Sequence, residues 1–133
     1  MADSPTTVNN IGVVMFTVSS QDDAIAFYTE KLGYELRADD SFGPDGEMRW
    51  VEVAPPGSTA RLALNEPMGG EPGGGSIGVE TEDVLGEHAR LSEVGGIDLD
   101  PEPMQTPGAP LMFMLRDPDG NTVVVVESPA VRE

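Results

Sequence analysis

Residues 117–127 read DPDGNTVVVVE, a tight turn followed directly by a strand. Pro118 fixes φ near the value that a turn needs, Gly120 permits positive φ, and the Asp and Asn side chains tolerate left-handed geometry. The valines after the turn favour a strand, because β-branched side chains pack well on a pleated sheet. This unit of turn and strand closes the second of two similar halves of the chain.

The two halves share one order of predicted elements, strand–helix–strand–strand–strand. In the first half, the pattern predicts a helix over 19–33 and strands at 11–18, 34–40, 48–54 and 59–66. In the second half, it predicts a helix over 83–96 and strands at 76–82, 97–103, 109–117 and 121–127. The end of the first helix, Leu32-Gly33, matches the end of the second, Val94-Gly95. Such self-similarity indicates an internal duplication.

The predicted fold class is α+β, built from two βαβββ modules. Each module alone would expose one face of its sheet, so we expect the modules to curl together around a shared cleft, the usual place for a ligand. We assign residues 1–10 to a flexible N-terminal lead and 11–133 to one domain, with modules at 11–66 and 76–128. The intervening segment, 67–75, is rich in glycine and proline and reads as a linker.

The charge balance of the chain is strongly acidic. There are 24 Asp and Glu residues against 7 Lys and Arg residues, a formal net charge of −17. This balance argues against nucleic acid and anionic membrane surfaces, since both attract positive charge, and it favours cationic or neutral ligands. Adaptation to a salt-rich cytoplasm explains the same composition equally well.

Cysteine usage and the N-terminus bear on the compartment. The chain has no cysteine, so no disulfide, thiolate metal site or cysteine nucleophile is possible. The opening MADSPTTVNN lacks the basic and apolar regions of a signal peptide, and no apolar run approaches about 18 residues. We therefore expect a cytoplasmic protein that does not bind membranes.

Four stretches carry a combined resemblance to a known family. They are AIAFYTEKLGYEL at 24–36, RWVEVAPPG at 49–57, GVETEDVLGEHARL at 78–91 and DPDGNTVVVVE at 117–127. Together they resemble the vicinal oxygen chelate superfamily, which includes glyoxalase, bleomycin-resistance proteins, fosfomycin-resistance proteins and extradiol dioxygenases. The resemblance implies two βαβββ modules that form a half-open barrel, usually in a dimer.

The resemblance also implies four metal-ligand positions, and none of them carries a good ligand here. The residues at these positions are Val13, Ala63, Ser76 and Val124. Valine and alanine cannot bind a divalent ion, and serine is a rare, weak ligand. We therefore predict that the protein holds no metal and no other cofactor.

Other residues offer no clear replacement. Glu127 lies three positions from Val124, so it should face the opposite side of the strand. His88 is the single histidine, and it falls on the apolar stripe of its predicted helix, which indicates packing rather than catalysis. The glycine-rich run 69–75 lacks the Gly-Lys-Ser/Thr ending of a phosphate-binding loop.

Alternation along MRWVEVA, residues 48–54, predicts which side chains line the cleft. Val51 and Val53 should face the helices, which leaves Trp50 and Glu52 for the other side. The predicted ligand-binding residues are Trp50, Glu52, Met15, Arg61 and Ser76. The run LMFML, 111–115, is apolar at every position, so either Met112 and Met114 or Phe113 would line the second half of the cleft.

Three functions are consistent with this pattern. The favoured one is a non-catalytic small-molecule-binding protein, expected to be a homodimer, with a cationic or amphipathic ligand suited to an acidic cleft that contains a tryptophan. The second is a lyase-like or dioxygenase-like enzyme with a non-standard site, in which Glu52 would be the acid–base group. The third is an interaction module that kept the fold without chemistry.

Overall fold

The structure is a computed structural model that describes residues 6–67 and 70–129. The first module comprises β1 (Val13–Thr17), α1 (Gln21–Ala26), the π-helical segment η1 (Phe27–Lys31), β2 (Glu35–Phe42), β3 (Met48–Ala54) and β4 (Arg61–Asn65). The second comprises β5 (Ser76–Thr81), α2 (Val84–Val94), β6 (Asp98–Leu99), β7 (Met112–Arg116) and β8 (Thr122–Glu127). The predicted repetition of a βαβββ order is confirmed.

The first helix begins at Gln21, close to the predicted start at residue 19. Ser20 is the N-cap, and its Oγ accepts a hydrogen bond of 3.1 Å from the backbone N–H of Asp23. After Ala26 the helix widens into η1, where the N–H of Leu32 donates to the carbonyl of Phe27. The sequence predicted a plain helix over 19–33, because a π-helical turn has no recognisable signal of its own.

Each module forms one open sheet. Sheet A has the strand order β1-β4-β3-β2, and sheet B has the order β5-β8-β7-β6. In each sheet the first strand of the module runs parallel to the last, and the other neighbours are antiparallel. The two sheets stay separate and do not close, which agrees with the predicted half-open arrangement.

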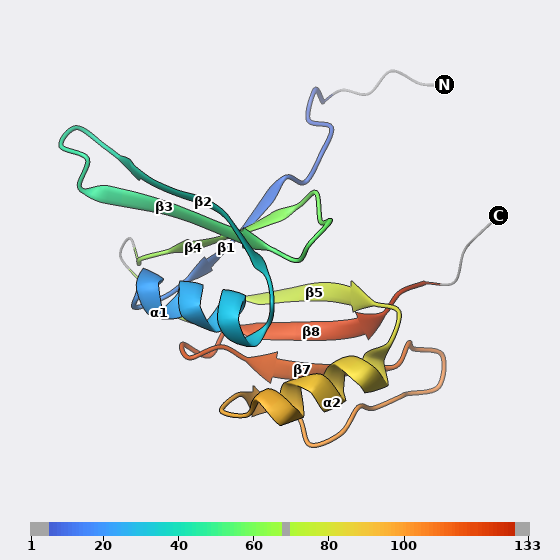
Figure 1. Ribbon diagram of the computed structural model, residues 1–133. Coiled ribbons are helices and arrows are strands. Elements are labelled where there is room, and N and C mark those ends of the chain that lie inside the picture. Colours follow the sequence, from blue (N-terminus) through green and yellow to red (C-terminus); the bar gives the residue numbers. More distant parts are fainter. Residues whose placement is uncertain (1–5, 68–69, 130–133) are drawn as a thin grey trace.

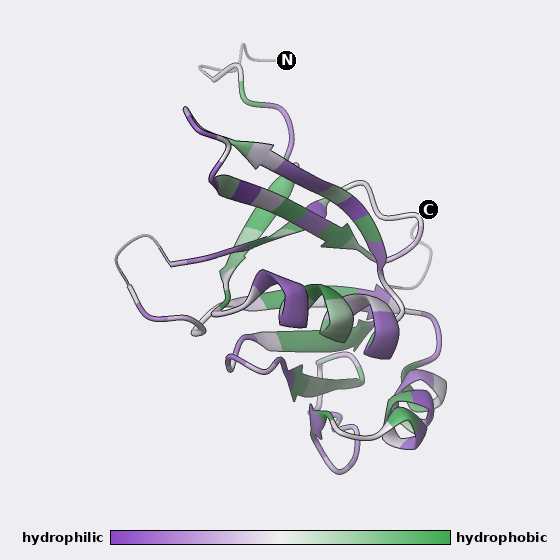
Figure 2. Cartoon of the chain, turned by 60° about the vertical axis from the view of Figure 1, so that its left-hand side comes forward, coloured by the Kyte–Doolittle hydropathy of each residue, from purple (hydrophilic) through white to green (hydrophobic). Residues whose placement is uncertain are grey.

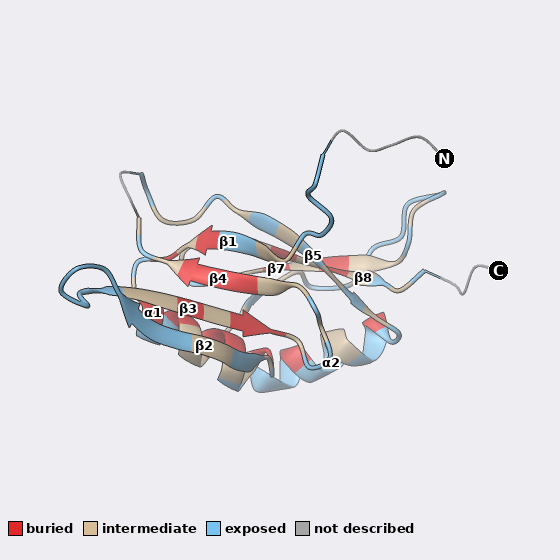
Figure 3. Ribbon diagram, turned by 90° about the horizontal axis from the view of Figure 1, so that it is seen from above, coloured by how far each residue is buried: buried red, intermediate tan, exposed pale blue. Residues whose placement is uncertain are grey.

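The helices cover one side of each sheet. Figure 1 shows α1 beneath sheet A and α2 in front of sheet B, and seen from above β2 and β3 lie over α1 (Figure 3). The opposite sides are called the helix-free faces below. Alternation and strand register identify residues on each face. The helix-free face of sheet A includes Met15, Trp50, Glu52, Arg61 and Ala63. The helix-free face of sheet B includes Ser76, Gly78, Met112, Met114 and Val124.

One hydrophobic core joins the two helix-covered faces. It contains Val51 and Val53 from sheet A, Phe113 from sheet B, and Phe27 and Tyr28 from η1. Figure 2 shows mainly apolar residues along β8 and β7, whereas polar and apolar residues alternate along β2 and β3. Burial of apolar area in this shared core is the main force that holds the modules together.

The turn at 117–121 also connects the modules. The Nδ2 of Asn121 donates to the carbonyl of Thr17 at 3.0 Å, and its Oδ1 accepts from the N–H of Gly75 at 2.9 Å. The Oδ2 of Asp117 accepts a hydrogen bond of 2.9 Å from the hydroxyl of Tyr28. Both Asp117 and Asn121 are buried, so these bonds stabilise the junction where polar groups are largely removed from water.

The end of the predicted linker is packed against this junction. A Cβ added at Gly75 would lie 2.6 Å from the ring of Phe16, so only glycine fits there without movement. Gly73 has φ of +89° and donates its N–H to the carbonyl of Thr17 at 2.9 Å. Residues 68–69 of this segment lie outside the described residues, as do residues 1–5 of the predicted N-terminal lead.

Residues 6–12 form neither helix nor strand, and the flexibility predicted for this lead remains a prediction. Among the residues that the structure describes, no helix has the length and apolar character needed to cross a membrane.

Candidate functional site

The predicted alternation along β3 is confirmed. Val51 and Val53 are fully buried in the core beneath the helices. Trp50 and Glu52 project from the opposite side, and both are only partly buried. The strand therefore carries aliphatic side chains towards the core and a tryptophan and a carboxylate towards the helix-free face.

Glu52 is held by two partners on this face. Its Oε2 accepts a hydrogen bond of 2.8 Å from the indole Nε1 of Trp50, and its Oε1 accepts one of 2.7 Å from the Nε of Arg61. The side chain of Glu52 is 12% exposed and that of Arg61 is 39% exposed. The carboxylate is therefore paired with a cation, and each of its oxygens is already occupied by one donor.

Met15 and Ala63 lie next to this group. In the sheet register Met15 pairs with Ala63, and Ala63 pairs with Glu52, so the three side chains share one face. Ala63 is fully buried, whereas Met15 is 61% exposed. The structure thus brings together four of the predicted ligand-binding residues, Met15, Trp50, Glu52 and Arg61.

The fifth, Ser76, lies on sheet B. It pairs with Thr122 at the start of β5 and is exposed. The register of β7 is also settled: Phe113 is fully buried, and its ring lies 5.0 Å from that of His88 in an edge-to-face contact. Met112 and Met114 therefore belong to the helix-free face, where Met114 pairs with Val124.

His88 has a packing role, as the sequence indicates. Besides its contact with Phe113, its Nε2 lies 2.7 Å from the carbonyl oxygen of Asp100 and forms a hydrogen bond with it. Both contacts bind α2 to the β6–β7 part of sheet B. The ring is therefore engaged on the helix-covered side.

The four positions at which the resemblance implies metal ligands all lie on helix-free faces. Val13 and Ala63 belong to sheet A, and Ser76 and Val124 to sheet B. Among the described residues, no three His, Cys, Asp or Glu side chains gather as a metal site requires. The side chains present at these positions do not fit a divalent ion, because three of the four offer no donor atom.

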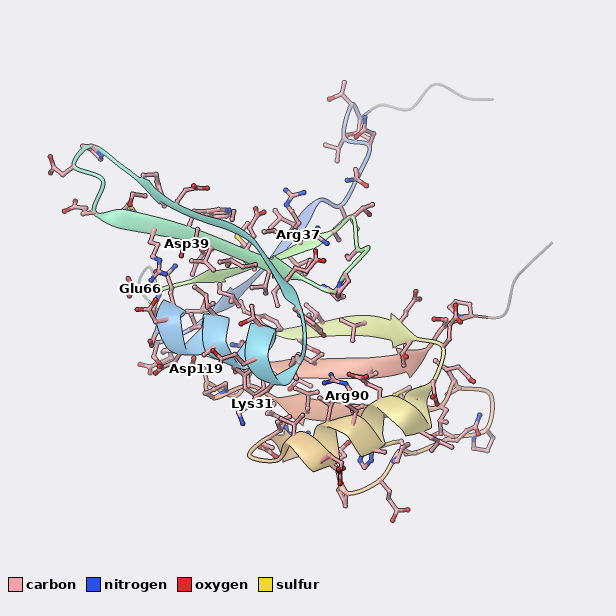
Figure 4. The ribbon with its side chains drawn as sticks, in the orientation of Figure 1. Lys31, Arg37, Asp39, Glu66, Arg90 and Asp119 are labelled. Carbon is pink, nitrogen blue, oxygen red and sulfur yellow. The ribbon has the colours of Figure 1, made fainter. Side chains whose placement is uncertain are left out.

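Two pockets lie beside the helices. One of about 300 Å³ is lined by Tyr34, Pro55 and Leu91 among others, and one of about 680 Å³ lies between α1 and Arg116. Neither is lined by any of the five predicted ligand-binding residues. Figure 4 shows Lys31 and Arg90 in the region between the two helices, where Arg90 donates to the carbonyl of Leu32 at 2.9 Å.

Large pKa shifts belong to two tyrosines near the module junction, the fully buried Tyr28 and the partly buried Tyr34. Burial, followed by the negative charge of Asp117, raises the pKa of Tyr28 far above its usual value. Burial likewise raises the pKa of Tyr34, and the charge of Glu87 adds to the shift. On the surface, hydrogen bonds from Arg49 lower the pKa of Asp39. These tyrosines stay protonated and serve the core rather than acid–base chemistry.

Sequence reasoning missed three side chains on the helix-free faces. Phe42 pairs with Met48 two residues before Trp50 on β3, and both are exposed. Met104 pairs with Met112 through an isolated antiparallel bridge. The alternation that placed Trp50 also reaches Met48, whereas nothing in the sequence near Met104 signals its pairing.

Comparison with known proteins agrees with this architecture. Residues 10–125 match the family described as the Glyoxalase/Bleomycin resistance protein/Dioxygenase superfamily. YetH of Bacillus subtilis (strain 168), an uncharacterized protein, is 33% identical over 123 residues, which cover 90% of this chain and 99% of YetH.

Two solved structures are similar along nearly their whole length. A member of the same superfamily from Sphaerobacter thermophilus is 31% identical, with a TM-score of 0.82 over 92% of this chain and 100% of that one. TnmS3, an antibiotic binding protein from Streptomyces sp. CB03234, is 32% identical, with a TM-score of 0.80 over 93% of this chain and 99% of that one. The sequence match, the fold and the duplicated modules agree, and the chain belongs to the glyoxalase/bleomycin resistance protein/dioxygenase superfamily.

Proposed function

We propose that this protein binds a small, mainly apolar molecule and does not catalyse a metal-dependent reaction. The observation that carries the proposal is Trp50, whose indole is fixed by Glu52 on a sheet face that no helix covers. The similarity to TnmS3, described as an antibiotic binding protein, supports a binding role. The proposed ligand-binding residues are Trp50, Glu52, Met15, Arg61 and Ser76.

The bond between Trp50 and Glu52 prepares the ring for a ligand. A side chain that is already held in place loses less conformational freedom on binding, so more of the contact energy appears as affinity. Arg61 balances the charge of Glu52 at 2.7 Å, and Asp40, opposite Trp50 on β2, adds an exposed carboxylate to the same face. Of the cationic and amphipathic ligands expected from the sequence, we propose the amphipathic class, because the carboxylate that contacts Trp50 is already paired.

We infer that the cleft is completed by a second copy of the chain. Within one chain the helix-covered faces pack into a common core, so the helix-free faces are on the outer side of each sheet. Apolar side chains such as Met15 are exposed there, as expected of a surface that binds something. In a two-fold homodimer, sheet A of one protomer would face sheet B of the other and form two identical clefts.

Independence from metal follows from the chemistry of the lining. Val13, Ala63 and Val124 stand where a metal-dependent relative would need donor atoms. Glu52, the carboxylate that pairs with Ala63 in the register of sheet A, is bonded to Trp50 and Arg61. The groups available in the proposed cleft therefore suit binding better than Lewis-acid chemistry.

The experiment is a ligand screen read by the fluorescence of Trp50, the only tryptophan in the chain. Neutral, cationic and anionic compounds are titrated, and each hit is remeasured by calorimetry with wild type, Trp50→Ala and the control Leu85→Ala, which alters an exposed side chain on α2. We expect Trp50→Ala to weaken binding about tenfold and the control to leave it unchanged. Equal affinity of wild type and Trp50→Ala would contradict the proposal.

A further inference from the structure

We propose that the binding surface is adaptable because it is lined with methionine, so that it accepts neutral apolar molecules of several shapes instead of one. This inference rests on the proposed binding function. It starts from the distribution of a single residue type over the fold. The described methionines are Met15, Met48, Met104, Met112 and Met114.

All five belong to the helix-free faces. On sheet A, Met15 pairs with Ala63 beside Glu52, and Met48 precedes Trp50 by two positions on the same strand. On sheet B, Met112 and Met114 alternate with the buried Phe113. Met104 exchanges two backbone hydrogen bonds with Met112, of 2.8 and 3.0 Å, and side chains of such a pair lie on the same side.

The core has the opposite composition. Its buried members are Val, Leu, Phe, Ala and Tyr, and no described methionine belongs to it. Methionine would fill irregular gaps in a core well, yet here it lies on the two helix-free faces instead. The core is therefore built from side chains with fewer conformations, and the flexible side chains are on the surface. Met15, Met48 and Met104 are 61%, 40% and 48% exposed, a degree at which polar residues are the usual choice.

The chemistry of the methionine side chain indicates what these faces accept. It is unbranched, has several rotatable bonds and carries a polarisable sulfur, so it can rearrange around differently shaped apolar groups and contact aromatic rings. Surfaces of this type bind several partners by repacking. A site for one rigid ligand would instead favour branched or aromatic residues with fixed rotamers.

The charge at the centre of sheet A is balanced. Glu52 is paired with Arg61 at 2.7 Å, so neither charge is free beside Trp50. The exposed carboxylates of Asp40 and Glu80 lie on the edge strands β2 and β5 of these faces. A neutral polycyclic or aliphatic compound would contact Trp50 and the methionines without breaking the pair of Glu52 and Arg61.

The test uses protein with ¹³C-labelled methionine methyl groups and three neutral probes of different shape: pyrene, Nile red and progesterone. We expect at least two probes to bind with dissociation constants within about tenfold of each other, and each to shift methyl resonances from both sheets. Ethidium serves as the cationic comparison. Binding of ethidium alone, or of a single probe only, would overturn the inference.

Variants separate this inference from the proposed function. Met112→Leu/Met114→Leu keeps the apolar area of β7 but makes it stiffer, and we expect it to spread the probe affinities by more than about tenfold while at least one probe still binds. Met15→Leu provides the same test on sheet A if the double variant folds poorly, and Leu85→Met on α2 is the control. Two outcomes would refute the role of methionine but not the binding function. One is that the variants bind all probes with the same affinities as wild type. The other is that a probe quenches the fluorescence of Trp50 without shifting any methionine methyl resonance. Failure of every compound to bind would contradict both.

Discussion

Trp50 and Glu52 lie two residues apart on β3 and are joined by a hydrogen bond of 2.8 Å from the indole Nε1 to Oε2. Residues at this spacing share one face of a strand, so the bond holds the ring along the sheet instead of letting it rotate into solvent. Arg61 on β4 binds the other oxygen of the same carboxylate. A tryptophan, a carboxylate and a guanidinium thus form one connected group on the helix-free face of sheet A.

Removing this support should affect binding more than stability. We predict that Glu52→Ala lowers ligand affinity several-fold and makes the fluorescence anisotropy of Trp50 decay faster, because the indole loses its fixed partner. The free energy of unfolding should fall by only about 1 kcal/mol, since the pair lies partly exposed. Glu35→Ala is the matched control, because Glu35 pairs with Arg37 at 3.0 Å on the neighbouring strand β2. Equal loss of affinity in both variants would speak against a positioning role for Glu52.

The hydroxyl of Tyr28 should contribute measurably to folding. We predict that Tyr28→Phe destabilises the protein by about 1–3 kcal/mol in urea unfolding, because the buried carboxylate of Asp117 loses a donor that water cannot replace. Tyr34→Phe is the control, since it removes the same atom from the other tyrosine of the chain. A loss no larger in Tyr28→Phe than in the control would show that the junction does not depend on this bond.

The same tyrosines predict how stability depends on alkaline pH. Burial raises the pKa of both Tyr28 and Tyr34 above the usual value near 10. Above pH 10 the unfolded chain releases protons that the folded chain keeps, so the free energy of unfolding must fall as the pH rises. Absorbance at 295 nm should therefore show tyrosinate only as the protein unfolds. Ionisation of either tyrosine in a protein that keeps its native circular dichroism would contradict the packing described.

Packing at the module junction can be tested at Gly75. We predict that Gly75→Ala destabilises the protein by about 1–3 kcal/mol, because its Cβ would meet the buried ring of Phe16. Gly70→Ala in the same glycine-rich segment should have almost no effect, since nothing lies within 4 Å of its added Cβ. Thermal and urea unfolding of both variants measure the difference, and similar stabilities would indicate that residues 70–75 act only as a spacer.

Salt should stabilise this chain. With a net charge of −17, self-repulsion opposes the folded state, and salt shortens its range from about 10 Å at 0.1 M to about 3 Å at 1 M. We predict a Tm that rises steadily between low and molar NaCl, measured by calorimetry. A Tm that stays constant or falls as NaCl increases would contradict this prediction. It would also contradict the interpretation that the acidic composition is an adaptation to a salt-rich cytoplasm.

Much of the fold followed from the sequence because its signals are local. A strand covered on one side by a helix must alternate, so the roles of Trp50 and Val51 could be predicted from residues 48–54 alone. The turn at 117–121 is likewise specified by its own residue types. Repetition of these local patterns was enough to predict two βαβββ modules.

The remaining features depend on contacts between distant segments. The run 111–115 is apolar at every position, so only its pairing with β8 and the packing of Phe113 against His88 decide which side chains are exposed. The pairing of Glu52 with Arg61 depends on the register of β3 against β4, which the sequence does not state. Similarly, composition alone made residues 67–75 read as a linker, although Gly75 is packed against Phe16.

The central claim is that sheet A of one copy and sheet B of another form the ligand cleft. Two variants each damage one side of the proposed cleft: Trp50→Ala on sheet A and Gly78→Phe on sheet B. Within a single chain, nothing lies within 4 Å of a Cβ added at Gly78. In homodimers of either variant, both clefts are damaged. A mixed dimer would instead combine one intact cleft with one that is damaged on both sides.

The direct measurement is ligand binding by the two variants, separately and after they have been mixed under conditions that allow subunit exchange. If exchange is random, half of the dimers are mixed, and we predict that about a quarter of all clefts regain wild-type affinity in calorimetry. If each cleft is instead formed within one chain, the mixture will bind no better than the average of the two variants, and that result would contradict the account.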